Sequence, residues 1–252
     1  MSHSSNTEIW ALVPAAGIGA RMQAELPKQY LRIGTRTILD LTLEKLLAVK
    51  NIKGVVLALH PNDQWWPKSE YTTHPKIHVT EGGDERCDSV VQALRYLLQE
   101  CAAQSHQANV WALVHDAARP CVAIEKIHEL IEFTFEKFSK TQALGGILAS
   151  PCADTVKRGE HGLIRKTEDR SHLWLAHTPQ FFPAEKLLQS IQYALANNIN
   201  VTDEASAIEA DGGKVALIHD RRDNIKITLP EDLLWAETIL KTAKEHTKET
   251  KL

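Results

Sequence analysis

The segment WALVPAAGIGARM, residues 10–22, decides how the rest of the chain is interpreted. It begins with four apolar residues, which predict a short buried strand that Pro14 stops. The loop that follows is made of small residues, with the basic residue Arg21 at its end and Lys28 just beyond it. Backbone N–H groups can approach phosphates closely where no side chain intervenes, and the two cations would offset the negative charge. The segment therefore predicts a triphosphate site, but taken alone it also fits a tight strand-to-helix turn with two surface cations.

The loop differs from the two familiar phosphate-binding motifs. Met22 stands where a dinucleotide-binding fingerprint has its third glycine, and the Gly-Lys-Ser/Thr ending of a P-loop is absent. The missing glycine and the charge of Arg21 argue against a dinucleotide-binding oxidoreductase.

Length and composition place the chain among ordinary globular proteins. At 252 residues it can bury roughly three-quarters of its unfolded surface without metal or disulfide support. The net charge of −3 argues against a nucleic-acid-binding face, and the scattered cysteines argue against a structural zinc site. The polar N-terminus has no signal region, and no apolar run approaches the ~20 residues of a membrane span. We therefore expect a cytoplasmic protein that binds neither nucleic acid nor a membrane.

Continuous apolar runs alternate with amphipathic patterns along most of the chain. The runs GVVLAL (54–59) and VWALVH (110–115) are typical of strands buried on both faces. Such strands, separated by helices, predict a Rossmann-like three-layer α/β fold with a mostly parallel sheet. Further strands are expected at 77–80 and 214–219, helices at 38–47, 90–98, 124–138, 187–195 and from Pro230, and a disordered tail at 244–252.

Ligands bind such sheets outside the carboxyl ends of the strands, so the loops that follow strands are the candidate functional loops. The second of them, EGGDERCDS (81–89), runs into a helix expected to start near Ser89. Gly82 would permit a close backbone approach. Asp88 or Ser89 could cap the helix or bind the base and ribose of a ligand, and the pattern does not decide between these roles.

The third loop, DAARP (116–120), follows the run at 110–115. Asp116 is placed there to hold a metal ion or a sugar hydroxyl. The alternative is a helix N-cap that has Arg119 as its ion-pair partner. His115 and Asp116 do not indicate a catalytic dyad, because no serine or cysteine nucleophile stands in a suggestive context.

An arm is predicted at residues 150–175 of an otherwise single domain, 1–252. DTVK (154–157) and LIRK (163–166) are strand candidates, and Gly159 and Gly162 between them would make the turn. An isolated hairpin is marginally stable in water. We therefore expect the arm to pack on a second subunit.

Two segments after the arm carry further candidates. Thr178 follows a strand-like run within residues 173–183, which returns the chain to the core. DNIKIT (223–228) is an expected strand in which Lys226 points away from the isoleucines. The usual role of such a lysine is simple exposure to solvent.

Taken together, PAAGIGARM, PKQY, GGDERCDSV, HDAARP, DTVK, TPQFF, TDEAS and DNIKIT resemble the 2-C-methyl-D-erythritol 4-phosphate cytidylyltransferases of the non-mevalonate isoprenoid pathway. The resemblance runs from about residue 8 to about residue 240, and its specificity comes from the order and spacing of the motifs. It implies a nucleotidyltransferase fold, the substrates CTP and a sugar-alcohol phosphate, release of pyrophosphate, and a need for Mg²⁺.

The resemblance also implies roles for the residues that match the family's motifs. The cytidine and ribose pocket would be lined by Ala15, Ala16, Gly17, Gly82, Asp84 and Ser89. The triphosphate would be held by Gly19, Arg21 and Lys28, and the two cations would stabilise the transition state. The residues near the metal, the ribose and the acceptor would be Asp116, Ala117 and Arg119, with Asp116 as the candidate metal ligand.

Lys226 and Arg170 would position the acceptor, with Thr155 beside them and Thr178 as a further substrate-binding candidate. In the family the arm is exchanged within a homodimer. Thr155 and Arg170 would therefore act in the neighbouring chain's site.

The implied chemistry accounts for the lack of a nucleophile or an acid–base pair. The attacking phosphate monoester is already anionic near neutral pH, because its second pKa is about 6. Fixed cations and Mg²⁺ would then catalyse by positioning and by electrostatic stabilisation. The alternatives are a ribitol 5-phosphate cytidylyltransferase of the same fold, a synthase that uses UTP or another nucleotide, and a binding protein without turnover.

Overall fold

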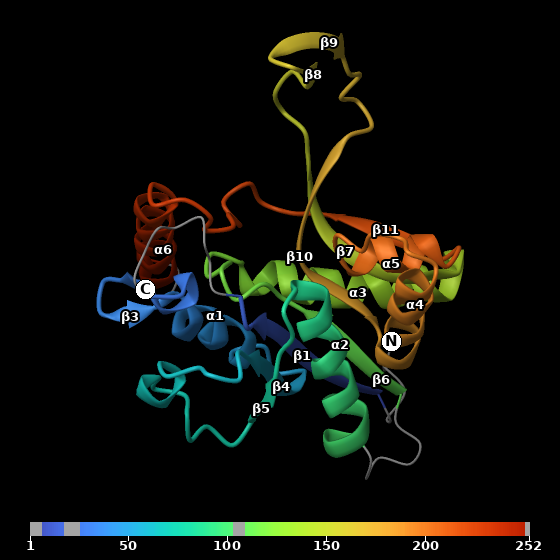
Figure 1. The fold of residues 1–252 in the computed structure, drawn as a ribbon. Helices are drawn as coiled ribbons and strands as arrows, with labels where there is room; N and C mark the ends of the chain where they lie inside the picture. The colour runs from blue at the N-terminus through green and yellow to red at the C-terminus, as the bar shows by residue number, and fades with distance from the viewer. Residues whose placement is uncertain (1–6, 18–25, 103–108, 250–252) are drawn as a thin grey trace.

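The computed structural model describes residues 7–17, 26–102 and 109–249 (Figure 1). Within this part of the chain a seven-stranded sheet has the order β11-β7-β10-β6-β1-β4-β5. Its strands are β1 (Thr7–Ala15), β4 (Ile52–Leu59), β5 (Ile77–Glu81), β6 (Asn109–Val114), β7 (Ala143–Pro151), β10 (Trp174–Pro183) and β11 (Lys214–His219).

The sheet is mostly parallel, as the buried apolar runs predicted. β10 alone runs antiparallel to its neighbours β6 and β7, and every other neighbouring pair is parallel. The carboxyl ends of β1, β4, β5 and β6 therefore meet at one edge of the sheet.

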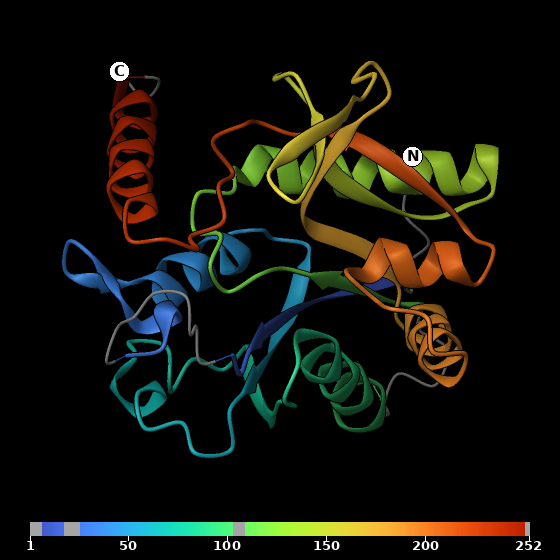
Figure 2. The same cartoon turned by 45° about the horizontal axis from the view of Figure 1, so that its top comes forward.

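Helices cover both faces of the sheet, because side chains alternate along each strand. In β1, Ile9, Ala11 and Val13 face one core, and Trp10 and Leu12 face the other. The first core is closed by α1 (Ile38–Leu47) and α3 (Ile124–Thr141), the second by α2 (Arg86–Tyr96), α4 (Ala184–Ala196) and α5 (Glu204–Ala210). Figure 2 shows α3 and α2 on opposite sides of the sheet.

The C-terminal helix α6 (Asp232–Glu249) packs beside α1 through a third apolar cluster that includes Ile38 and Ala236. The expected helix from Pro230 thus begins two residues later. The prediction of a disordered tail at 244–252 is wrong for residues 244–249, which continue α6. None of the helices in the described ranges has the length and apolar composition that a membrane crossing requires.

Three expected boundaries along the chain are wrong. Pro14 does not stop β1, which continues to Ala15 along β4. Proline cannot donate a backbone hydrogen bond, but pairing with β6 already ends at Leu12, so no bond to β6 is lost at Pro14. Helix α2 begins at Arg86 rather than near Ser89, and a helical turn, Leu97–Cys101, extends it. Residues 223–228 form no strand: residue 223 lies in a turn, and residues 224–228 have no regular secondary structure.

The arm is a hairpin of β8 (Lys157–Glu160) and β9 (Leu163–Thr167), which stands away from the sheet in Figure 1. The first strand was expected at 154–157, so that prediction is three residues too early. Gly159 lies inside β8, and the turn is made by His161 and Gly162 with φ of 50° and 78°. Every residue of both strands is exposed.

Candidate active site

A cleft lies at the edge of the sheet where the parallel strands end, and a cavity of about 160 Å³ occupies it. The loops after β1 and β6 form part of its wall, together with the start of α2. The residues that line it are Pro14, Ala15, Ala16, Gly17, Lys28, Gln29, Arg86, Ser89, Asp116, Ala117, Ala118 and Lys226.

Lys28 is carried by a short 3-10 helix, η2 (Lys28–Tyr30), that is fixed on both sides. Gln29 is buried, and its side-chain amide donates to the carbonyl oxygen of Ala15 over 2.7 Å. The Tyr30 hydroxyl donates to Asp63 over 2.8 Å, and burial together with that carboxylate raises the pKa of the phenol. Tyr30 thus stays a neutral donor, and Lys28 is attached to a rigid turn.

The second loop lies against the first through small residues. A Cβ added to Gly82 would lie 2.6 Å from Cβ of Ala16 and 2.8 Å from Oγ of Ser89, so only glycine permits this approach. Ser89 lines the cavity, and its hydroxyl accepts from the N–H of Gly83 over 3.1 Å. Asp88 takes the capping role by accepting from the N–H of Glu85 over 3.1 Å.

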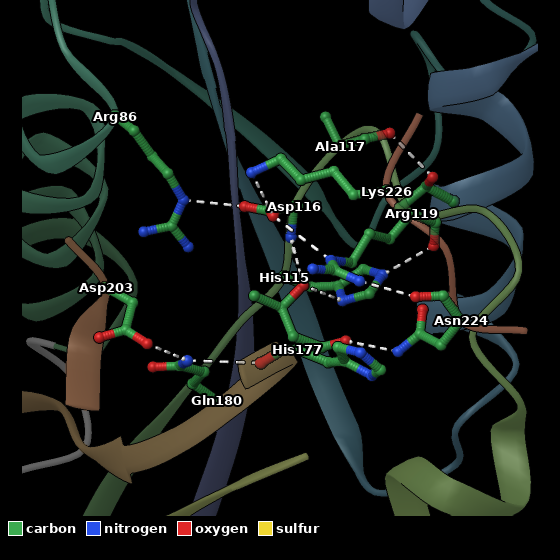
Figure 3. Close-up of polar contacts among 12 residues, drawn as sticks. Arg86, His115, Asp116, Ala117, Arg119, His177, Gln180, Asp203, Asn224 and Lys226 are labelled. Carbon is green, nitrogen blue, oxygen red and sulfur yellow. Dashed lines mark hydrogen bonds and ion pairs between the residues drawn. The ribbon is translucent and has the colours of Figure 1, made fainter. Parts of the chain in front are cut away.

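Asp116 stands at the centre of a cluster of three cations, one from its own loop and two from distant segments (Figure 3). Its Oδ1 accepts from Nε of Arg86 over 2.8 Å, and its Oδ2 lies 2.8 Å from Nζ of Lys226 and 3.5 Å from Nε of Arg119. Burial opposes ionisation of Asp116, but Arg86, Lys226 and Arg119 together hold the pKa of its carboxyl well below the usual range. The carboxylate is therefore charged at every physiological pH.

Arg86 is a site residue that the sequence did not single out, although it lies in the quoted motif GGDERCDSV. It joins Asp116 to Glu204 at the start of α5. Its two terminal nitrogens bind the two Glu204 oxygens at 2.7 and 3.0 Å. The signal that could have found it is a basic residue just before a predicted helix at the carboxyl end of a strand.

A buried hydrogen-bond chain supports the Asp116 loop from behind. The N–H of Asp116 donates to Oγ1 of Thr178 over 3.0 Å, and Thr178 bonds Nδ1 of His115 over 3.0 Å. Nε2 of His115 must carry its proton, because its partner at 3.0 Å is the carbonyl oxygen of Arg119. Burial lowers the pKa of His115 to about 4, so the ring is neutral and has a structural role.

Thr178 lies within β10, beside the cis peptide bond to Pro179, rather than after a strand as expected. It lines a second cavity of about 180 Å³. The other lining residues are Arg86, Asp116, Arg119, Ala176, His177, Gln180, Thr202, Asp203 and Lys226. Arg86, Asp116 and Lys226 belong to both cavities, so the cluster around Asp116 separates them.

Lys226 comes from the irregular segment 223–228, which is held on the Asp116 loop. The N–H of Ile227 donates to the carbonyl of Ala118 over 2.9 Å, and Arg119 donates to the carbonyl of Asn224 over 2.6 Å. The side chain of Lys226 is about one-third exposed, at 36%, and it pairs with Asp116. It is thus part of the cluster rather than a solvated surface lysine.

Four of the described residues that were expected at the site line neither cavity. Gly19 and Arg21 fall outside the described residues. Gly82 and Asp84 line neither cavity, and Asp84 is exposed. Thr155 and Arg170 are exposed residues of the arm and also line neither cavity.

Among the described residues no group of three or more His, Cys, Asp or Glu side chains is arranged to hold a metal ion. Asp116 is the acidic residue within the described lining of the first cavity. Any metal there would need most of its ligands from substrate or water.

Comparison with known proteins shows which family the chain resembles. The sequence model of the 2-C-methyl-D-erythritol 4-phosphate cytidylyltransferase family matches residues 9–242. Proteins of that name from Shewanella sediminis and Escherichia coli are 48% and 46% identical over 242 and 239 residues. These alignments cover 96% and 94% of this chain and 97% and 95% of the relatives.

A solved structure supports the same assignment. The crystal structure of the Francisella tularensis 2-C-methyl-D-erythritol 4-phosphate cytidylyltransferase matches with a TM-score of 0.78 at 35% identity. The structural alignment covers 92% of this chain and 100% of the solved chain.

Proposed function

This chain belongs to the 2-C-methyl-D-erythritol 4-phosphate cytidylyltransferase family, and from that premise we propose how its cleft works. The enzyme is a nucleotidyltransferase that joins CTP to 2-C-methyl-D-erythritol 4-phosphate. The products are 4-diphosphocytidyl-2-C-methyl-D-erythritol and pyrophosphate. Ribitol 5-phosphate is not favoured as the acceptor, because the family model and the relatives carry the methylerythritol name.

The observation that carries the mechanism is the pair of cavities that share Arg86, Asp116 and Lys226. We assign CTP to the first cavity, where Ala15, Ala16 and Gly17 present a loop of small residues. We assign the acceptor to the second. An acceptor phosphate beside Lys226 would then face the α-phosphorus of CTP across the cluster.

The reaction brings two polyanions together, so charge repulsion is the main barrier. An oxygen of the acceptor phosphate attacks the α-phosphorus in line, and the bond to the departing pyrophosphate breaks. Lys28 stabilises charge on the triphosphate, and Arg119 and Lys226 offset charge on the acceptor side. We add Gly19 and Arg21 to the triphosphate contacts on the strength of the family resemblance.

The described cleft needs no general base. The attacking phosphate is anionic near neutral pH, since its second pKa is about 6. The buried ring of His115 bonds Thr178 and the Arg119 carbonyl, so its role is to hold the loop. Positioning and fixed charge are sufficient for this chemistry.

Mg²⁺ is the cofactor that we propose, with Asp116 as its protein ligand. The Asp116 carboxylate stays ionised, and a carboxylate offers about four lone-pair positions, so it can bind an ion besides Arg86 and Lys226. Mg²⁺ is commonly bound by one or two carboxylates together with substrate phosphates and water. The residues therefore fit the ion, which when bound would neutralise charge on the phosphate oxygens.

We also propose a homodimer in which the arm of each chain completes the partner's site. Thr155 and Arg170 line neither cavity of their own chain. Leu163 and Ile164 on β9 are 72% and 67% exposed, an apolar surface that a hairpin without a core does not cover. An exchanged arm would bury these side chains and bring Arg170 to the acceptor.

The test is release of pyrophosphate from CTP with Mg²⁺ and each of two acceptors. We expect turnover with 2-C-methyl-D-erythritol 4-phosphate and little with ribitol 5-phosphate. Equal rates would contradict the acceptor assignment. CTP binding without release of pyrophosphate in the presence of either acceptor would identify a binding protein instead.

A further inference from the structure

In the motif TDEAS, residues 202–206, Thr202 and Asp203 line the second cavity, but Glu204 has no role in the mechanism so far. The motif forms the start of α5, where Asp203 caps the helix by accepting from the N–H of Ser206 over 2.9 Å. The next residue, Glu204, is only 2% exposed and lines neither cavity. A carboxylate is costly to bury unless it is paired, so its partner is informative.

That partner is Arg86, the cation that both cavities share. Nη1 and Nη2 of Arg86 bind Oε1 and Oε2 of Glu204 at 2.7 and 3.0 Å, a bidentate pair. Nε of the same guanidinium donates to Asp116 over 2.8 Å. A planar guanidinium bound on two edges has a fixed orientation, so Glu204 determines where Nε points.

Lys226 is bound to Asp116 in a different way. Its ammonium is a point charge on a flexible stem, and its side chain is 36% exposed against 28% for Arg86. An incoming phosphate can therefore attract Lys226 away from Asp116. Arg86 cannot move toward the phosphate with Lys226, because Glu204 binds the other edge of its guanidinium. Arg86 therefore keeps Asp116 in place.

We propose that Glu204 is a positioning residue of the transfer reaction, acting through Arg86 to orient the Asp116 carboxylate between the two cavities. The inference rests on the proposed function for its kinetic consequence. Its structural part, the fixed Arg86 guanidinium, does not depend on which substrates bind.

The kinetic test uses Glu204→Gln, which keeps the size of the side chain but removes its charge. We expect kcat to fall about 10- to 100-fold, because a charged hydrogen-bond pair of this kind contributes to orientation. The affinity for CTP measured by calorimetry should change less than about threefold, since the loop of small residues is untouched. The control is Asp211→Asn at the other end of α5, which removes the charge that pairs with Lys186 and weakens the Ser190 contact, at a residue that lines neither cavity.

A double-variant cycle separates positioning from general destabilisation. If Glu204 acts through Arg86, Glu204→Gln should have almost no further effect in an Arg86→Met background. If the fold-losses in kcat of the two single variants multiply in the double variant, the proposal is overturned. A loss in Glu204→Gln that is no greater than the loss in Asp211→Asn would also overturn it.

A readout without turnover keeps the inference separate from the proposed function. The Nε–H proton of Arg86 should give a sharp, slowly exchanging NMR signal, assigned by its loss in Arg86→Lys. That signal should broaden in Glu204→Gln and persist in Asp211→Asn. A signal unchanged in Glu204→Gln would refute the role of Glu204, whereas a wild-type enzyme without pyrophosphate release would refute the proposed function alone.

Discussion

The cleft around Asp116 and the arm of β8 and β9 differ in how they place charged residues: the cleft buries them and the arm exposes them. In the cleft, Asp116 is 6% exposed, and its charge is balanced by Arg119 of its own loop and by Arg86 and Lys226 from two other segments. In the arm, ion pairs such as Arg158–Glu168 and Arg165–Glu160 lie in solvent, where such pairs contribute little.

The difference shows which part of the site one chain can build. The cleft has its own support, because Gln29, Thr178 and Glu204 are buried and hydrogen-bonded behind it. The arm has no core, and its apolar side chains Leu163 and Ile164 are exposed. One chain therefore orders the nucleotide side, and on our proposal a second chain completes the acceptor side.

The largest expected effect lies in the cleft. Lys28→Ala should lower kcat about 10²- to 10³-fold while changing the KM for CTP much less, because a preorganised charge contact acts mainly in the transition state. Steady-state pyrophosphate release measures both constants. Lys53→Ala, a lysine that lines neither cavity, is the control. A pure KM effect would reassign Lys28 to ground-state binding.

The support behind the cleft predicts a pH dependence of stability. His115 has a pKa of about 4 in the folded state against its ordinary 6.5, so between these values the unfolded chain binds the extra proton. Stability should therefore fall as pH falls from 6.5 to 4, by at most about 3 kcal/mol from this group. Urea unfolding at several pH values gives the free energy of unfolding as a function of pH. This free energy should depend less on pH in His115→Gln than in the wild type. An equal dependence on pH would mean that His115 is not buried as the neutral ring.

The arm should affect the acceptor rather than the nucleotide. Arg170→Ala should raise the KM for the sugar phosphate about 10- to 100-fold, the usual cost of losing a charged hydrogen bond. Arg165→Ala, at the other end of the arm, should leave that KM unchanged. A matching rise in the KM for CTP would place Arg170 at the triphosphate instead.

Mixed chains test whether the arm acts across the dimer. Lys28→Ala and Arg170→Ala chains, unfolded together and reassembled, should regain about a quarter of the wild-type sites, since half of the dimers then hold one intact site. At a subsaturating acceptor concentration, pyrophosphate release should rise about 2.5- to 25-fold above the Arg170→Ala parent and at least about 25-fold above the Lys28→Ala parent. If it does not rise, the arm acts within its own chain.

The smallest expected effect is on folding. Replacing the arm's strands, residues 156–168, by a short Gly-Ser turn should change the free energy of unfolding of the monomer by less than about 1 kcal/mol, because the strands bury no side chain. Urea unfolding at low protein concentration measures it. A loss of several kcal/mol would show that the arm packs on its own chain.

The elements that sequence reasoning missed have local physical causes. β7 was not predicted, because Gly145 and Gly146 interrupt its apolar pattern, and a Cβ at Gly145 would lie 2.0 Å from the ring of Phe182. Pro14 reads as a strand breaker, yet it stands where the ladder with β6 has ended. The hairpin was misplaced because its turn is made by His161, a non-glycine residue with positive φ.

The lining of the first cavity includes four residues of the quoted motifs, Lys28, Ser89, Asp116 and Lys226. Arg86 and Glu204 are 118 residues apart, and nothing local to either indicates the pair. Neither pattern nor spacing showed that Gly82 packs on Ala16 without lining the cavity.

The sequence by itself determined the parallel sheet, the family and the small-residue loop, because hydrophobic periodicity and backbone freedom are properties of neighbouring residues. Only the tertiary structure decided which charges balance Asp116. The partners of Asp116 are set by the distances between side chains, and their segments meet only after the sheet has formed. Electrostatic energy depends on distance and burial and not on the order of residues along the chain.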